Sequence, residues 1–231
     1  MITTMIHGED SPWMLMELDW SNLVKNISAK VYTKGHVFYE QNEVAENVFV
    51  VDKGRVALGI LNNDGSSRTI ITLDEGCIFG NLSLFDDRAN SCRAFVVSDT
   101  ISVFVLPKSL VLERIENDST LMHNMLLESN RTNRILIKQL ELMHCRNAES
   151  IVCFFIVHLV NQYSEIYNFQ DGCYKCITMR FTHQDIADVT GLSRVSVSNI
   201  LSSLIKERIL EKRDKKYVIL NQEALEQKIK I

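Results

Sequence analysis

The sequence is poor in proline, has no long apolar run and carries no overall excess of positive charge. Two prolines among 231 residues, 46% hydrophobic residues and no low-complexity tract are not the composition of a disordered chain. The longest apolar run, residues 151–160, has about ten residues and contains His158, whereas a membrane-spanning helix needs roughly twenty. We therefore expect a folded protein that has no membrane span and no membrane partner.

The N-terminus also lacks the features of an export signal. Glu9 and Asp10 stand where a signal peptide would be basic, and no apolar core with a cleavage site follows them. This pattern predicts a cytoplasmic protein, in which the six cysteines would stay reduced. Cys173 and Cys176 have C-x-x-C spacing, but no second pair completes a four-ligand zinc site. We interpret them as residues of a strand, with a thiol redox switch as the alternative.

No residue pattern typical of an active site or a metal site is present. The six histidines are scattered, and the sequence shows no nucleophile–base pair, paired carboxylates or glycine-rich phosphate loop. We therefore predict no catalytic residues, no metal ligands and no enzymatic activity. No cofactor is assigned from the residues themselves.

The formal net charge of −4 is unevenly distributed along the chain. Residues 178–220 hold eight basic and five acidic residues, a local charge of +3, which leaves −7 on the rest. An acidic total argues against a protein that binds nucleic acid over its whole surface. The local excess instead points to one basic segment near the C-terminus.

The N-terminal half shows short strands that are separated by turn residues. Residues 47–51, 55–61, 68–73 and 101–106 are rich in β-branched and aromatic side chains, with turn signals between them. Many short strands at this spacing predict an antiparallel β-barrel of jelly-roll type, within an α+β protein.

Beyond Pro107 the pattern becomes helical, because no proline or glycine occurs up to residue 146. The spacing predicts a short helix over 109–115 and a helix of about seven turns over 119–145. Apolar residues on two faces of the long helix favour contacts with the barrel and with a partner helix. A surface helix with one apolar face is the alternative.

The chain continues with an apolar helix and a strand. We predict a helix over 149–167, with Cys153 in the core, then a turn at Asp171 and Gly172 and a strand over 175–180. These elements suggest three parts: a barrel over residues 1–116, a long helix over 117–147 and a C-terminal domain over 148–231.

The C-terminal domain contains the pattern of two helices joined by a tight turn. Thr182 and Asp185 resemble a capping box that starts a helix over 184–190, and Gly191 ends that helix. Ser193 then caps a second helix. This order predicts a helix-turn-helix.

The exposed residues of the second helix suit the recognition of base edges. An arginine can bind guanine with two hydrogen bonds, an asparagine can do so with adenine, and a valine can contact a thymine methyl group. The predicted base contacts are Arg194, Val195, Ser198 and Asn199. The predicted contacts to the DNA backbone are Thr182, His183, Gln184, Ser193, Ser196, Arg213 and Lys215, the last two on a β-hairpin wing over 209–220. A winged helix that binds protein instead of DNA is the alternative.

Two stretches resemble a known family of transcription regulators. Residues 182–201, THQDIADVTGLSRVSVSNIL, are similar to the helix-turn-helix signature of the Crp/Fnr family. Residues 76–85, GCIFGNLSLF, resemble its G-x-x-x-G-E-L-x-L-F segment in the cyclic-nucleotide-binding barrel. The resemblance covers almost the whole chain.

The resemblance implies an effector-binding barrel and a dimerisation helix over 119–145. It implies a homodimer that binds double-stranded DNA at a pseudopalindromic site, with half-sites about one helical turn apart. RNA polymerase is the further partner that it implies. Many family members have Glu and Arg where this chain has Val195 and Asn199, so we expect a changed half-site that is richer in A·T pairs.

The effector segment departs from the cyclic-AMP-binding pattern. The family's Glu in the G-E-L motif is Asn81 here, and its phosphate-binding Arg is Cys92, although a one-residue slip would aim Arg93 at a phosphate. We therefore expect an unidentified effector that is not cyclic AMP, and an apolar or aromatic anion such as a halophenol is one candidate class. The predicted pocket between barrel and long helix is lined by Gly80, Asn81, Leu82, Ser83, Cys92, Arg93, Ile135 and Leu136.

Other sensor chemistries of the family have weaker support. No cysteine precedes Cys77, so the N-terminal iron–sulfur ligands of the oxygen-sensing branch are missing. A thiol switch at Cys173 and Cys176, or at Cys92, stays open as an alternative means of gating.

Overall fold

The computed structural model describes residues 13–14, 18–61, 67–143, 147–179, 181–214 and 216–229. The chain forms two compact units that divide after Arg134, within the long helix α3 (Ser119–Met143). The predicted domain boundaries at residues 116 and 147 stay predictions. No helix in the described ranges is both long and apolar enough to cross a bilayer.

The first unit is built from two β-sheets. The five-stranded sheet has the order β1 (Trp13–Met14), β6 (Ser67–Leu73), β5 (Val56–Leu61), β8 (Arg93–Val96) and β3 (Val37–Tyr39). The four-stranded sheet has the order β2 (Lys30–Thr33), β9 (Thr100–Pro107), β4 (Asn47–Lys53) and β7 (Ile78–Phe79). All pairs are antiparallel except β1 with β6, so the predicted antiparallel architecture is confirmed. The described strands form two separate sheets and do not close into one barrel.

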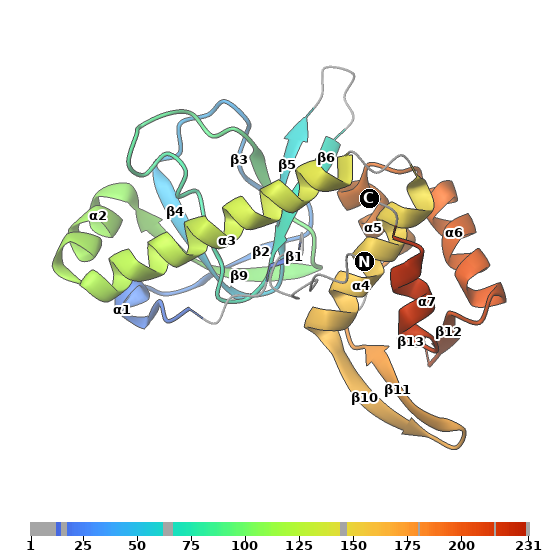
Figure 1. Ribbon diagram of the computed structural model, residues 1–231. Coiled ribbons are helices and arrows are strands. Elements are labelled where there is room, and N and C mark those ends of the chain that lie inside the picture. The colour runs from blue at the N-terminus through green and yellow to red at the C-terminus, as the bar shows by residue number, and fades with distance from the viewer. Residues whose placement is uncertain are drawn as a thin grey trace. The chain divides into compact units, whose positions relative to one another are not determined.

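Two helices and the first turns of α3 pack at one end of this unit. The helices α1 (Ser21–Val24) and α2 (Lys108–Asn117) lie side by side (Figure 1), and α3 follows directly. Asp118 caps the start of α3, because its Oδ1 accepts a hydrogen bond of 2.9 Å from the backbone N–H of Thr120. One apolar cluster joins these helices to the sheets, and its members include Leu23, Val48, Ile78, Leu106, Val111, Ile115, Leu121 and Met125. The face of α3 that carries Leu121 and Met125 therefore positions the helix against the strands.

The second unit combines helices with a four-stranded sheet. Its elements are α4 (Ala148–Tyr163), β10 (Ser164–Phe169), β11 (Gly172–Ile177), α5 (His183–Thr190), α6 (Arg194–Lys206), β12 (Leu210–Arg213), β13 (Lys216–Ile219) and α7 (Gln222–Gln227). The sheet order is β10-β11-β13-β12. Strands β10 and β11 form a long hairpin that extends away from the helices of its own unit (Figure 1).

The predicted helix over 149–167 is too long. α4 ends at Tyr163, and residues 164–169 pair with residues 172–177 as an antiparallel hairpin. The turn at Asp171 is confirmed, whereas the predicted strand over 175–180 begins at Gly172 instead. The alternating order Ile166, Tyr167, Asn168, Phe169 suits a strand, and pairing with β11 decides against further helix.

The core of the second unit lies around α4. Residues 152–160 of this helix are all buried, and the prediction that Cys153 belongs to the core is confirmed. Lys228 ties α7 to the rest of the unit, because its Nζ lies 2.8 Å from a carboxylate oxygen of Glu149 and 2.8 Å from one of Glu207. The helices that carry the predicted interface are thus anchored to a continuous apolar core.

Candidate nucleic-acid interface and effector segment

The first helix of the helix-turn-helix is set by the capping box. The backbone N–H of Asp185 donates to Thr182 Oγ1 at 3.1 Å, and the backbone N–H of Thr182 donates to Asp185 Oδ2 at 2.7 Å. Gly191 then ends α5 with a φ of 72°, in the left-handed region that glycine adopts without a steric cost. The predicted capping box and the predicted role of Gly191 are therefore confirmed.

The second helix, α6, presents most of the predicted base-contacting residues to solvent. Ser193 caps it, with its Oγ accepting a hydrogen bond of 3.0 Å from the backbone N–H of Ser196. The opposite face is buried through Val197, Leu201 and Leu204. Arg194, Val195 and Asn199 are exposed, with Val195 exposed to 69%, and Ser198 is half-buried. The methyl groups of Val195 are therefore accessible at the start of the helix.

The start of α6 is electropositive. No acidic residue lies in its first turn, so the partial positive charge of the helix N-terminus adds to that of Arg194. His183 Nε2 lies 3.0 Å from the hydroxyl of Tyr217 on β13. Burial lowers the pKa of His183, and the charges of Lys212 and Arg194 lower it further. Lys212 of the wing and Arg194 of α6 therefore both place positive charge near His183.

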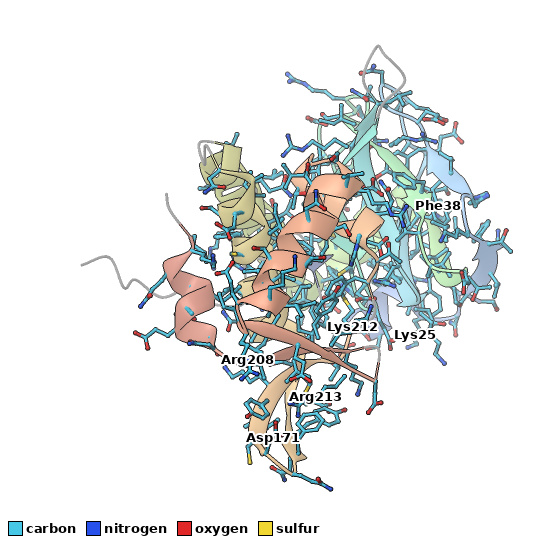
Figure 2. All side chains as sticks on the ribbon, turned by 90° about the vertical axis from the view of Figure 1, so that its right-hand side faces the viewer. Lys25, Phe38, Asp171, Arg208, Lys212 and Arg213 are labelled. Carbon is cyan, nitrogen blue, oxygen red and sulfur yellow. The ribbon has the colours of Figure 1, made fainter. Side chains whose placement is uncertain are left out.

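The remaining residues predicted to contact the DNA backbone differ in their availability. Thr182 is exposed and serves the capping box, whereas the side-chain amide of Gln184 donates to Asp188 at 2.6 Å. The hydroxyls of Ser193 and Ser196 lie 2.8 Å apart and share one hydrogen bond. Lys215 lies outside the described residues, and Arg213 is held by carboxylates. Figure 2 labels Arg208 in the turn before β12, and Lys212 and Arg213 on that strand.

The effector segment of the first unit, residues 76–85, contains a glycine that no other residue could replace without strain. Gly80 has a φ of 78°, and a Cβ there would lie 2.8 Å from the backbone oxygen of Asn47. Asn81 follows, and its Nδ2 donates to Glu128 Oε2 on α3 at 2.9 Å. Thr132 Oγ1 donates to the other oxygen of Glu128, also at 2.9 Å. The side chain of Asn81 is thus bound to the long helix.

Sequence reasoning missed Glu128, which is 4% exposed. Burial raises the pKa of its carboxyl group, and the hydrogen bonds from Thr132 and Asn81 oppose that shift. The available signal was its spacing of three residues from the buried Met125, which places it on the inner face of α3.

Cys92 and Arg93 point to different surroundings. Cys92 is buried, and burial raises the pKa of its thiol to about 11, so the group stays uncharged. Arg93 Nε lies 3.3 Å from Glu40 Oε2, and its guanidinium lies 5.3 Å from the ring centroid of Phe95. Neither residue supplies an uncompensated positive charge to a phosphate.

The other predicted pocket residues are divided between the two units. Ser83 is buried, and its hydroxyl has no hydrogen-bond partner among the described residues, whereas Leu82 is exposed to 55%. Ile135 is buried and Leu136 is exposed to 37%, and both belong to the second unit. Their predicted part in one pocket stays a prediction.

Cys173 and Cys176 lie on β11 but face different surroundings. Cys173 is exposed and its Sγ donates to Asn168 Oδ1 at 2.9 Å, whereas Cys176 is buried. Residues three apart on a strand point to opposite faces and have Cα atoms about 10 Å apart, which is too far for a disulfide. A switch that joins these two thiols would need β11 to change its conformation.

The two units define a class of protein. A winged helix-turn-helix with an exposed, electropositive second helix is a DNA-binding module, and the two antiparallel sheets belong to a separate unit. Residues 152–228 match the model of the Crp-like helix-turn-helix domain, and residues 29–118 match that of the cyclic nucleotide-binding domain. The chain belongs to the Crp/Fnr family, whose members are transcription regulators and not enzymes.

Individual relatives match over most of their length. The chain is 26% identical to the cyclic AMP receptor protein of Thermus thermophilus over 181 residues, 78% of each chain. It is also 26% identical to the global nitrogen regulator of Synechococcus elongatus over 204 residues, 85% of this chain and 87% of the relative.

Solved structures confirm the fold. FixK2 from Bradyrhizobium japonicum is similar with a TM-score of 0.72 and 21% identity, over 87% of this chain and 96% of that one. A CooA mutant from Carboxydothermus hydrogenoformans is similar with a TM-score of 0.76 and 17% identity, over 93% and 97% of the two chains.

Proposed function

We propose that the protein is a homodimeric transcription regulator that binds a pseudopalindromic DNA site and is gated by a small-molecule effector. The observation that carries the DNA-binding part is the exposed surface of Arg194, Val195 and Asn199 at the electropositive start of a well-anchored helix. In bacteria such a regulator acts in the cytoplasm, and RNA polymerase is its proposed further partner.

The exposed side chains of α6 define the chemistry of the half-site. Arg194 can donate two hydrogen bonds to one guanine, and Asn199 can exchange two with one adenine. Val195 can make an apolar contact with the methyl group of a thymine. The half-site is therefore expected to hold few G·C pairs, one of them read by Arg194.

The test of DNA binding is selection of bound duplexes from random DNA, followed by affinity measurements on the selected site. Arg194→Ala is expected to weaken binding by about 1–3 kcal/mol and to relax the preference at one base position, because a base contact is lost. Arg88→Ala is the matched control, since Arg88 lies on a loop of the first unit with its side chain exposed to 86%. An equal loss on every sequence would make Arg194 a phosphate contact, and no salt-dependent binding by the wild type would refute the function.

The effector is proposed to bind near Asn81, Ser83 and Cys92. A buried hydroxyl without a partner, as at Ser83, is costly unless a ligand or water satisfies it. The ionisable groups beside this segment include the Glu128 carboxyl, the uncharged Cys92 thiol and Tyr39, which lies close to Cys92, whereas Arg93 is paired with Glu40. This composition supports a neutral or hydrogen-bond-donating effector over a cyclic nucleotide or another anion.

A further inference from the structure

The two cations at the end of the wing face the β10–β11 hairpin. Arg213 and Lys216 are opposite each other in the ladder between β12 and β13. The guanidinium of Arg213 lies 4.6 Å from the ring centroid of Phe169 and 5.5 Å from that of Tyr174. Lys216 Nζ lies 4.3 Å from the ring centroid of Tyr167 and donates to its hydroxyl at 2.7 Å. Both cations are therefore used in cation–π contacts within the sheet.

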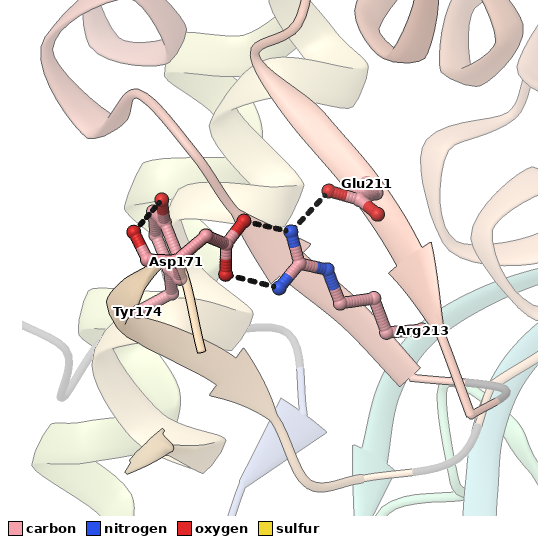
Figure 3. A network of polar contacts seen from close by, with 4 residues as sticks. All are labelled: Asp171, Tyr174, Glu211 and Arg213. Atoms are coloured by element: carbon pink, nitrogen blue, oxygen red, sulfur yellow. Dashed lines mark hydrogen bonds and ion pairs between the residues drawn. The ribbon is translucent and has the colours of Figure 1, made fainter. Parts of the chain in front are cut away.

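Arg213 also binds two carboxylates. Its two terminal nitrogens donate to the two oxygens of Asp171 at 2.9 and 2.8 Å, and one of them also donates to Glu211 at 2.7 Å (Figure 3). Asp171 is at the tip of the β10–β11 hairpin, and β12 is separated from that hairpin by β13. The long, forked side chain thus connects the outer wing strand to a turn two strands away.

This cluster is a poor partner for a phosphate. The hydrogen bonds from Arg213 lower the pKa of Asp171 and that of Glu211, so both carboxylates are ionised at neutral pH. The positive charge of Arg213 is already matched by two carboxylates. A phosphate at Arg213 would have to displace these partners and approach their negative charges.

Lys212 is placed differently, although it is the next residue. Neighbouring residues of a strand point to opposite faces, and Lys212 pairs with Tyr217 while Arg213 pairs with Lys216. Lys212 Nζ lies 5.6 Å from the ring centroid of Tyr217, whose hydroxyl contacts His183 at the start of α5. Lys212 therefore belongs to the side of the wing that carries the helix-turn-helix, and its side chain is exposed.

We infer that Arg213 is a positioning residue, which locks the wing to the β10–β11 hairpin through Asp171, and that Lys212 makes the wing's contact with the DNA backbone. This inference rests on the proposed DNA-binding function and replaces Arg213 by Lys212 among the predicted phosphate contacts. A fixed wing holds Lys212 at a constant distance from Arg194, so that one duplex can meet both.

The test measures DNA affinity against salt concentration for Lys212→Ala, Arg213→Lys and Arg213→Ala, with Arg88→Ala as the control. Lys212→Ala is expected to reduce the slope of log affinity against log salt by about one per protomer, because one phosphate contact is lost. Arg213→Lys keeps the charge but loses the forked geometry, so it is expected to weaken binding like Arg213→Ala and to leave the slope unchanged. If Arg213→Ala lowers the slope and Arg213→Lys preserves it, Arg213 contacts phosphate and the inference is wrong.

The lock itself is tested without DNA. Asp171→Ala, Arg213→Ala and the double variant are compared by thermal unfolding. We expect the double variant to lose no more stability than Arg213→Ala alone, because Arg213→Ala already removes the contact with Asp171 together with those to Glu211 and the rings. Additive losses would overturn the lock. Since this measurement does not involve DNA, it separates a failure of the lock from a failure of the proposed function.

Discussion

Glu128 and Asn81 link the effector segment to the long helix through a single hydrogen bond. In the family pattern a glutamate stands at the position of Asn81, whereas here the carboxylate comes from α3 and the amide from the segment. A carboxylate that accepts hydrogen bonds therefore still lies beside the segment, but it belongs to the long helix. A ligand that binds Asn81 must therefore compete with, or bind beside, Glu128.

The raised pKa of Glu128 predicts a pH-dependent contribution to stability. The folded state favours the protonated carboxyl. The contribution of Glu128 to the free energy of unfolding therefore increases as the pH falls through the raised pKa, and it is complete below the pKa of the unfolded chain, near 4.5. Glu128→Gln keeps a neutral side chain of the same shape that can hydrogen-bond both Asn81 and Thr132. We expect its advantage in free energy of unfolding over the wild type to be largest near pH 8 and to shrink toward pH 5.

Chemical denaturation at several pH values measures this difference. Glu116→Gln on the exposed face of α2 removes the same charge and is the matched control. Asp74, whose pKa burial also raises, is present in both proteins and cancels from the comparison. A constant difference between Glu128→Gln and wild type from pH 5 to pH 8 would show that Glu128 does not titrate in this range.

At the scale of elements, α3 is the helix with the most exposed apolar residues. Leu126, Ile137 and Leu140 are exposed to 58%, 56% and 60%. Their spacings of eleven and three residues place them on one side of a helix. An apolar stripe of this kind supports the proposed pairing of α3 with a second copy of the same helix.

The double variant Leu126→Asn/Leu140→Asn is expected to dissociate the proposed dimer. Each buried leucine contributes roughly 1.5–3 kcal/mol, so the dissociation constant should rise by more than tenfold. Sedimentation velocity against concentration measures it, with a protomer mass of 26.5 kDa. Val44→Asn, at a residue exposed to 53% outside α3, is the control. Unchanged dimerisation of the double variant would refute the role of this face.

Local signals predicted most elements well. The caps at Asp118, Thr182 and Ser193 and the glycine at residue 191 act within one helical turn, so the sequence contains the whole cause of each boundary. The end of α4 was different. No capping residue marks Tyr163, and the change from helix to strand depends on pairing with β11, which lies later in the chain.

At the scale of the whole molecule, charge is divided between a basic segment and an acidic remainder. The segment 178–220 carries +3, whereas the other residues carry −7. Non-specific attraction to DNA is therefore expected to be modest and specific base contacts to dominate recognition. Arg213 belongs to the basic count but is neutralised by its carboxylates, so the charge available to DNA is smaller than the sequence total suggests.

A ligand screen by thermal unfolding tests the effector at this scale. A ligand at one hundred times its dissociation constant stabilises the folded state by about 2.7 kcal/mol, which is readily detected. Cyclic AMP is expected to leave the unfolding midpoint unchanged, because Cys92 is uncharged and Arg93 is paired with Glu40. Aromatic acids and neutral donors are compared under the same reducing conditions. A large shift with cyclic AMP would overturn this reading of Asn81 and Cys92.

The sequence by itself determined the start of the long helix, the helix-turn-helix and the residues that α6 exposes, because caps, glycines and periodicity act over a few residues. The tertiary structure decided the partners of the long polar side chains. Arg213 meets Asp171 across 42 residues, and Asn81 meets Glu128 across 47. Such pairs depend on how distant strands and helices pack, and no local pattern specifies them. They also decide which of the predicted cations are available to DNA.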